Sequence, residues 1–146
     1  METIVIRPIQ KQDNVQIAAL IRQVLIDLNV PKVGTAYADP QLDCMFETYS
    51  KSKSIYYVIE NQDLIIGGAG ISQLENEAGT ICELQKMYFL PEARGLGLGY
   101  QMIQKCLQSA LDFGYQKCYL ETMPYMEAAQ QLYKKVGFEY ICAPMG

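Results

Sequence analysis

Hydrophobic and polar residues change their spacing several times along the chain, and each change predicts an element. Residues 3–9 (TIVIRPI) alternate and are rich in β-branched side chains, which predicts an opening strand. From Asp13 onward, apolar residues recur three or four positions apart, which predicts an amphipathic helix capped by Asp13 or Asn14. A second helix is predicted from Asp39, with Pro40 at its first helical position.

The middle of the chain predicts a meander of antiparallel strands separated by turns. The three predicted strands are residues 54–60 (SIYYVIE), 64–74 (LIIGGAGISQL) and 81–90 (ICELQKMYFL). Within the second strand, Gly67, Gly68 and Gly70 predict a bulge or a close approach of another backbone segment.

After the meander, the pattern predicts a crossover from one strand to another. A glycine-rich turn at residues 94–99 precedes an amphipathic helix that begins near Leu98 and ends at Gly114, where a left-handed cap is expected. Residues 117–122 (KCYLET) predict a strand. Because a helix separates the two strands, we expect this one to lie parallel to residues 81–90.

A final helix from Met126 to Gly137 and a last strand at residues 138–142 (FEYIC) complete the predicted elements. Their order is strand, two helices, three strands, helix, strand, helix and strand, which indicates the mixed α/β (α+β) class. The length of 146 residues suits a single domain over residues 1–146.

The amino-acid composition limits the kinds of binding partner that we expect for this chain. Half of the residues are hydrophobic, 19% are charged and the formal net charge is -4, which argues against nucleic acid and favours cationic partners such as amines. The sequence has no apolar run of membrane-spanning length and no secretory signal pattern at its start. We therefore expect a cytoplasmic chain without a membrane partner.

Histidine does not occur in the sequence, which limits the chemistry. A His-based zinc site, a Ser-His-Asp triad and a Cys-His dyad are excluded, and no metal is expected. Proton transfer must use Glu, Asp, Tyr, Lys, Cys or water. The five cysteines are odd in number and form no CxxC pair, which favours reduced thiols over disulfides.

The turn at residues 94–100 (RGLGLGY) lies where a strand ends and a helix begins, and the unpaired amides of a helix N-terminus attract anions. A P-loop would continue with Lys and Ser or Thr after its second glycine, but Gly99 is followed by Tyr100 and Gln101. A Rossmann turn would need glycine at position 100 and a parallel βαβ unit. From the turn alone, a phosphate cradle and a plain strand-to-helix connection both remain open.

Two motifs in the right order resemble the Gcn5-related N-acetyltransferase (GNAT) family. Arg94, Gly97 and Gly99 occupy the fixed positions of the pattern Gln/Arg-x-x-Gly-x-Gly/Ala. Residues 128–140 (AAQQLYKKVGFEY) resemble a second block, in which a helix with Ala-x-x-Leu-Tyr ends in Gly-Phe. The resemblance, which covers residues 1–141, implies a mixed, mostly antiparallel twisted sheet flanked by helices, with a splayed parallel pair of strands at the cofactor site.

This resemblance also implies a function. It implies an N-acetyltransferase that moves an acetyl group directly from acetyl-CoA to a primary amine of a small molecule or peptide. The turn would bind the pyrophosphate, and the preceding strand would pair with pantetheine. The implied cofactor-binding residues are Met87, Tyr88, Phe89, Arg94, Gly95, Leu96, Gly97, Leu98, Gly99 and Tyr100. The acceptor would lie between the N-terminal helices and the strands, with residues 33–40, including Tyr37, as candidate lining.

Two residues are candidates for proton transfer. Tyr133 matches the family's general acid, and a phenol with an ordinary pKa of about 10 can protonate a leaving thiolate at neutral pH. Glu83 is the candidate general base, because the resemblance implies a glutamate in this region and the even spacing from Met87 predicts that both side chains lie on one face. Glu121, acting through a water, is the alternative base.

Two features depart from the family pattern. Met126 stands where many members have asparagine, and the chain ends before the strand that usually follows residues 138–142. A shortened chain, pairing with a partner chain and direct docking of the last strand all remain open, and an unpaired edge makes a homodimer a hypothesis. These departures favour an alternative function, a catalytically weak acetyl-CoA-binding regulatory or interaction module. Tyr133 and Glu83 favour an enzyme.

Overall fold

The computed structural model describes residues 3–28, 38–74, 79–120 and 127–138. Its centre is a five-stranded sheet in the order β1-β2-β3-β4-β5. The strands are β1 (Ile4–Pro8), β2 (Ile55–Asn61), β3 (Leu64–Gln73), β4 (Ile81–Phe89) and β5 (Lys117–Tyr119). Neighbouring strands are antiparallel from β1 to β4, whereas β5 lies parallel to β4. The predicted meander and the predicted parallel crossover are both confirmed.

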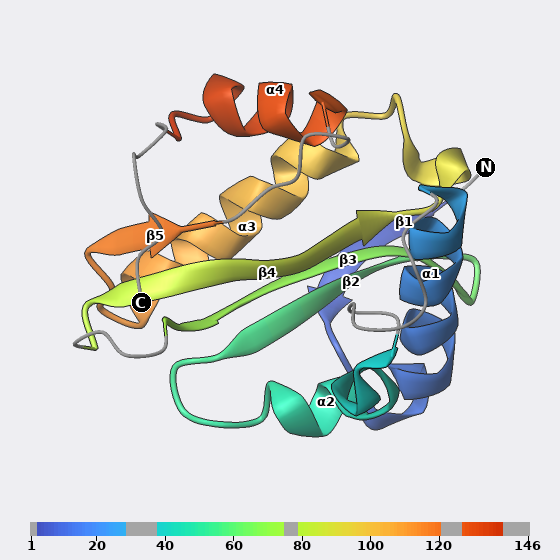
Figure 1. Cartoon of the computed structure of the whole chain (residues 1–146), viewed down its shortest axis with the longest axis horizontal. Helices are drawn as coiled ribbons and strands as arrows, with labels where there is room; N and C mark the ends of the chain where they lie inside the picture. The colour runs from blue at the N-terminus through green and yellow to red at the C-terminus, as the bar shows by residue number, and fades with distance from the viewer. Residues whose placement is uncertain (1–2, 29–37, 75–78, 121–126, 139–146) are drawn as a thin grey trace.

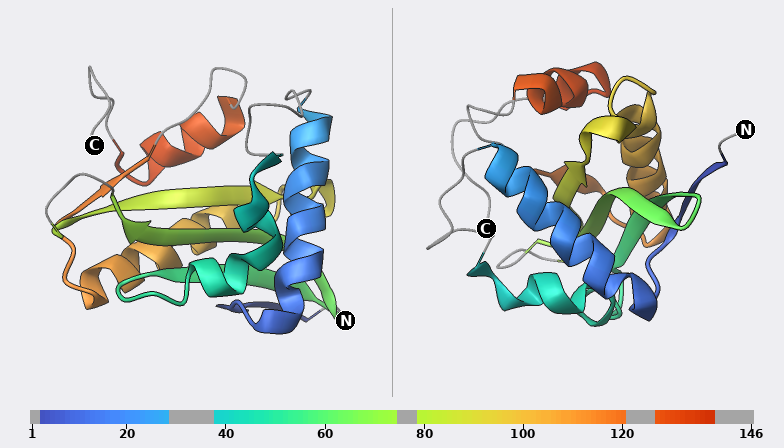
Figure 2. Two further views of the ribbon diagram at one scale, coloured as in Figure 1. Left: turned by 60° about the horizontal axis from the view of Figure 1, so that its bottom comes forward. Right: turned by 90° about the vertical axis from the view of Figure 1, so that its right-hand side faces the viewer.

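Helices cover both faces of this sheet. The α-helices are α1 (Asn14–Asp27), α2 (Met45–Thr48), α3 (Leu98–Asp112) and α4 (Glu127–Lys135), and the short 3₁₀ helices are η1 (Lys11–Asp13), η3 (Pro40–Cys44) and η4 (Pro91–Ala93). Figures 1 and 2 show α1 and α2 on one face and α3 and α4 on the other. Each face has its own apolar core: Ile17, Met45 and Val58 belong to the α1 side, and Met102 and Ile103 to the α3 side.

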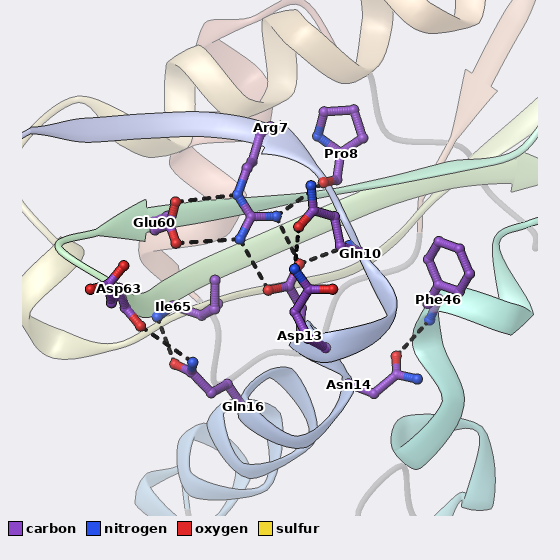
Figure 3. Close-up of polar contacts among 11 residues, drawn as sticks. Arg7, Pro8, Gln10, Asp13, Asn14, Gln16, Phe46, Glu60, Asp63 and Ile65 are labelled. Carbon is purple, nitrogen blue, oxygen red and sulfur yellow. Dashed lines mark hydrogen bonds and ion pairs between the residues drawn. The ribbon is translucent and has the colours of Figure 1, made fainter.

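Polar side chains at the start of α1 connect elements instead of capping the helix. The predicted capping of α1 by Asp13 or Asn14 is wrong, because the Asp13 carboxylate accepts hydrogen bonds from both terminal nitrogens of Arg7 at 2.8 and 3.0 Å (Figure 3). The Asn14 side chain reaches α2, where its Oδ1 accepts the N–H of Phe46 at 2.8 Å. Arg7 also donates to Glu60 at 3.3 Å, so this cluster ties β1, β2 and the start of α1 together.

The second predicted helix begins as its capping residues indicate. The carboxylate of Asp39 accepts the N–H of Gln41 at 2.9 Å, and Pro40 follows the cap. The first turns are the 3₁₀ helix η3, and the α-helical part, α2, has only four residues.

The glycines of β3 confirm both predicted reasons for their presence. The pairing of β2 with β3 is irregular between Ile59 and Glu60, where β3 contains one extra residue, Ile66, next to Gly67. An added Cβ at Gly70 would lie 2.6 Å from the backbone carbonyl of Ile55 and 2.6 Å from Tyr56 Cδ2, and one at Gly68 would lie 2.6 Å from Tyr56 Oη. These two glycines therefore make room for the buried ring of Tyr56, whose hydroxyl reaches across β3 and donates to the carbonyl of Lys86 in β4 at 2.7 Å.

Two glycines end helices, as predicted. Gly114 follows α3 with a φ of 91°, and Gly137 follows α4 with a φ of 105°. Glycine adopts this left-handed conformation without the steric penalty of a Cβ atom.

Two further features concern the cysteines and the helices. In the part of the chain that the structure describes, Cys44, Cys82, Cys106 and Cys118 form no disulfide; Cys82 and Cys106 are buried, whereas Cys44 is exposed. Within the same ranges, none of the helices combines the length and the apolar character that a membrane span requires.

Candidate functional site

The parallel pairing of β4 with β5 is short in the part of the chain that the structure describes. The two strands pair only from Ile81 to Glu83, whereas β3 accompanies β4 as far as Phe89. Among the described residues, no strand lies beside residues 84–89 of β4 on the β5 side (Figure 1). This is the splayed pair that the resemblance implied, and its open strand edge can accept an extended ligand.

A bulge lies within this open part of β4. Between the pairs formed by Gly70 with Gln85 and by Gly68 with Tyr88, β4 contains one more residue than β3. Lys86, at the bulge, has a φ of 50°, a left-handed conformation that non-glycine residues rarely adopt. Because such a conformation costs energy, the hydrogen bond from Tyr56 to the Lys86 carbonyl is a physical reason for its persistence.

The bulge overturns one prediction about Glu83. Met87 packs against the core on the α3 side, whereas Glu83 is hydrogen-bonded to Gln85, which in turn contacts Tyr49 of the α1-side core. The expectation that Glu83 and Met87 share a face is therefore wrong. One inserted residue breaks the alternation of side chains, so the even spacing no longer places the two residues together.

In the described part of the structure, the glycine turn between η4 and α3 has free space beside two of its glycines. Gly95 and Gly97 have φ values of 78° and 74°, and an added Cβ at either position would have no described heavy atom within 4 Å. Gln101 donates the first hydrogen bond of α3, to the carbonyl of Gly97 at 3.2 Å. The three amides between these two residues precede the helical ladder and can donate to an anion.

Gly99 and Arg94 have different structural roles in this turn. An added Cβ at Gly99 would lie 2.7 Å from Leu132 Cδ2, so this glycine allows α4 to pack closely on the start of α3. The guanidinium of Arg94 donates to the carbonyl of Phe89 at 3.1 Å and ties the turn to the end of β4. Both residues shape the turn through contacts with the protein itself.

The remaining residues of the turn differ in exposure. Leu98 is buried in the α3-side core, whereas Leu96 and Tyr100 are 52% and 42% exposed. Lys135 of α4 places its Nζ 5.7 Å from the centroid of the Tyr100 ring, which brings a positive charge close to the turn. Sequence reasoning missed Lys135, although its position two residues after Tyr133 on the last helix was a usable signal.

Tyr133 lies on α4 and is buried, with 8% of its surface exposed. It belongs to the same core as Leu98, against which Met87 and Phe89 also pack. Burial, with a smaller contribution from Tyr88, raises the pKa of the Tyr133 phenol to about 12. The structure therefore brings Tyr133 to the side of β4 that carries Met87 and Phe89, and Glu83 lies on the other side.

Several predicted residues lie outside the described ranges. These are Glu121, Met126, residues 33–37 with Tyr37, and the end of the predicted last strand from residue 139. The alternative base, the position of the family asparagine and the last strand therefore have no structural account.

The fold and the site together define a class, that of acetyltransferases with a sheet splayed between two parallel strands beside a glycine turn. The model of the Acetyltransferase (GNAT) family matches residues 22–138, and the chain belongs to this family of acyltransferases.

Relatives and solved structures agree with this class. YjgM of Escherichia coli K12, named an uncharacterized N-acetyltransferase, is 40% identical over 143 residues, which are 97% of this chain and 86% of that protein. A predicted acetyltransferase of Clostridium acetobutylicum, solved with acetyl-CoA, has a TM-score of 0.81 at 20% identity and covers 99% of this chain and 95% of its own. The aminoglycoside N-acetyltransferase AAC(6')-Iy, solved with CoA, has a TM-score of 0.78 at 16% identity, over 100% and 94% of the two chains. At these identities the two structures show the shared fold.

Proposed function

We propose that the chain is an N-acetyltransferase that moves an acetyl group from acetyl-CoA directly to a primary amine of a small molecule or peptide. The observation that carries this proposal is the glycine turn at the start of α3, directly after the part of β4 that has no described strand beside it on the β5 side. The family membership and a structural neighbour solved with acetyl-CoA support it.

The residues present fit the two ends of acetyl-CoA. A diphosphate group fits the turn, because no described atom lies within 4 Å of an added Cβ at Gly95 or Gly97 and the nearby amides carry partial positive charge. An extended pantetheine fits the edge of β4 at residues 87–89, where no described strand lies and backbone groups can pair with its amides. Arg94 and Gly99 support this site indirectly, by holding the turn against β4 and α4.

Acetyl-CoA, when bound, supplies an acetyl thioester as the activated acyl donor. Tyr133, whose phenol is protonated at neutral pH and whose pKa burial raises to about 12, donates its proton to the sulfur as the carbon–sulfur bond breaks. Glu83 accepts the proton that the amine loses as the carbon–nitrogen bond forms. In this arrangement the cosubstrate occupies the α3 side of β4, and the amine approaches from the side that carries Glu83.

A calorimetric titration with acetyl-CoA tests the binding site. Gly97→Ala adds a Cβ to a left-handed residue of the turn itself, and Gly114→Ala is the matched control at the other end of the same helix. Each change costs about 1–2 kcal/mol of stability, because both glycines have positive φ and neither added Cβ meets a neighbour.

We expect one saturable site in the natural chain and in Gly114→Ala, and binding weakened about tenfold or more in Gly97→Ala. Equal affinity in the two variants would overturn the assignment of the turn, and a natural chain that does not bind would overturn the proposal. Saturable binding without release of CoA in the presence of any amine would favour the alternative, a regulatory acetyl-CoA-binding module.

A further inference from the structure

Three side chains form a continuous hydrogen-bond chain that ends at the candidate base. Tyr49, at the end of α2, directs its hydroxyl to Oε1 of Gln85 at 2.6 Å. The Nε2 of Gln85 donates to Oε1 of Glu83 at 2.8 Å. Gln85 and Glu83 are two apart on β4, so both side chains leave the same face of the strand.

The direction of this chain follows from elementary hydrogen-bond chemistry. An ionised carboxylate only accepts, so the Gln85 amide must turn its nitrogen toward Glu83 and its oxygen toward Tyr49. An amide oxygen also only accepts, so the phenol of Tyr49 must donate. Burial raises the pKa of Tyr49 above its ordinary value, which keeps the phenol protonated and able to fill this role.

Packing fixes the position of Tyr49, the first residue of this hydrogen-bond chain. Tyr49 is 5% exposed, and its ring centroid lies 5.1 Å from that of the fully buried Tyr56. Tyr56 in turn holds the bulge of β4 through its bond to the Lys86 carbonyl, one residue after Gln85. The Nζ of Lys86 lies 6.0 Å from the centroid of the Tyr49 ring. Tyr49, whose phenol orients Gln85, therefore packs against Tyr56, the same residue that holds the bulge.

We propose that Tyr49 and Gln85 are positioning residues that hold Glu83 in one orientation and confine its proton uptake to Oε2. This inference rests on the proposed role of Glu83 as the base. Gln85 occupies Oε1, and among the described residues no hydrogen bond is formed to Oε2, which remains for the amine. Without the phenol, the Gln85 oxygen loses its donor, so the side chain is held at one end only and no longer fixes the orientation of the Glu83 carboxylate.

The first arm of the test observes the Gln85 side-chain amide by ¹H–¹⁵N NMR, assigned by its loss in Gln85→Met. We expect resonances displaced from those of an exposed glutamine, and Tyr49→Phe should return them at least half of the way. Tyr57→Phe is the matched control, because it removes an equally buried tyrosine hydroxyl, bonded to Ser109 at 2.6 Å on the α3 side of the sheet. It should leave the Gln85 resonances unchanged.

The second arm measures release of CoA from acetyl-CoA with the best primary amine among spermidine, lysine and neamine. We expect Tyr49→Phe and Gln85→Met each to lower kcat about tenfold, with the KM for acetyl-CoA within about twofold and with Tyr57→Phe unaffected. In a Glu83→Gln background, Tyr49→Phe should have no further effect, because a residue that acts through Glu83 is not additive with its loss.

Each outcome has one meaning. Unchanged Gln85 resonances in Tyr49→Phe overturn the inference, and so does an equal loss of kcat from Tyr49→Phe with and without Glu83. A Glu83→Gln variant with the natural kcat would instead overturn the proposed role of Glu83 as base. Should none of the three amines be acetylated, the NMR arm decides the inference alone.

Discussion

Replacing Gly68 by alanine tests whether β3 contains glycine to make room for Tyr56. The added Cβ would lie 2.6 Å from Tyr56 Oη, 2.7 Å from Tyr56 Cε1 and 2.9 Å from Ile17 Cδ1. Tyr56 and Ile17 are both fully buried, so neither side chain can move into solvent. The ring must shift, and the shift strains the core and weakens the bond to the Lys86 carbonyl.

The expected cost follows from these contacts. Overpacking of a core costs about 1–3 kcal/mol, and a carbonyl that loses its partner costs about 1–3 kcal/mol more. Alanine also lowers the conformational entropy of the unfolded chain, which offsets about 0.5 kcal/mol of this loss of stability. We therefore expect a loss of about 3 kcal/mol, which lowers Tm by about 10 °C for a chain of this size.

Thermal and urea unfolding followed by circular dichroism measure this loss. Gly79→Ala is the matched control, because its added Cβ would have no described neighbour closer than 3.8 Å. In a Tyr56→Leu background, the further cost of Gly68→Ala should fall to about 1 kcal/mol or less, because the ring is gone. A Gly68→Ala protein as stable as Gly79→Ala would refute the reasoning.

Two further predictions concern titratable groups. Burial acts to raise the pKa of Asp13, but hydrogen bonds from Arg7 and the Gln10 N–H, together with the Arg7 charge, lower it below its ordinary value. The stabilisation that the Asp13 carboxylate gives the folded state is fully present above its unfolded-state pKa. It is lost as the pH falls through the lower folded-state pKa. Asp13→Asn should therefore be less stable in urea at about pH 7 and approach the natural chain at about pH 2, and a constant difference would contradict this. Because burial raises the pKa of Tyr133 to about 12, kcat should show no basic limb from this group up to about pH 10, and Tyr133→Phe should lower kcat at least about tenfold across that range. Turnover of Tyr133→Phe within about twofold of the natural chain would exclude it as the acid.

Local patterns allowed much of the fold to be predicted. The periodicity of apolar residues indicated the main elements, and Gly114 and Gly137 marked helix ends because their left-handed conformation is a local property. The turn at residues 94–99 was found for the same reason, since positive φ at Gly95 and Gly97 requires glycine. The capping of α1 was predicted wrongly because the side chains of Asp13 and Asn14 bond to other elements, Arg7 of β1 and Phe46 of α2, and the shared face of Glu83 and Met87 was predicted wrongly because of the bulge in β4.

Within the site, the sequence by itself determined the glycine turn, the strand that precedes it and the helix that carries Tyr133, because each depends on neighbours along the chain. Only the tertiary structure decided on which side of β4 the candidate base lies. The bulge of β4 has a lysine, Lys86, at its left-handed position, so no glycine marks it in the sequence. Tyr56, 30 residues before Lys86, holds the bulge through a hydrogen bond. The hydrogen bonds from Tyr49 to Glu83 likewise depend on the tertiary structure. Tyr49 and Gln85 are 36 residues apart and meet only because α2 packs against the sheet.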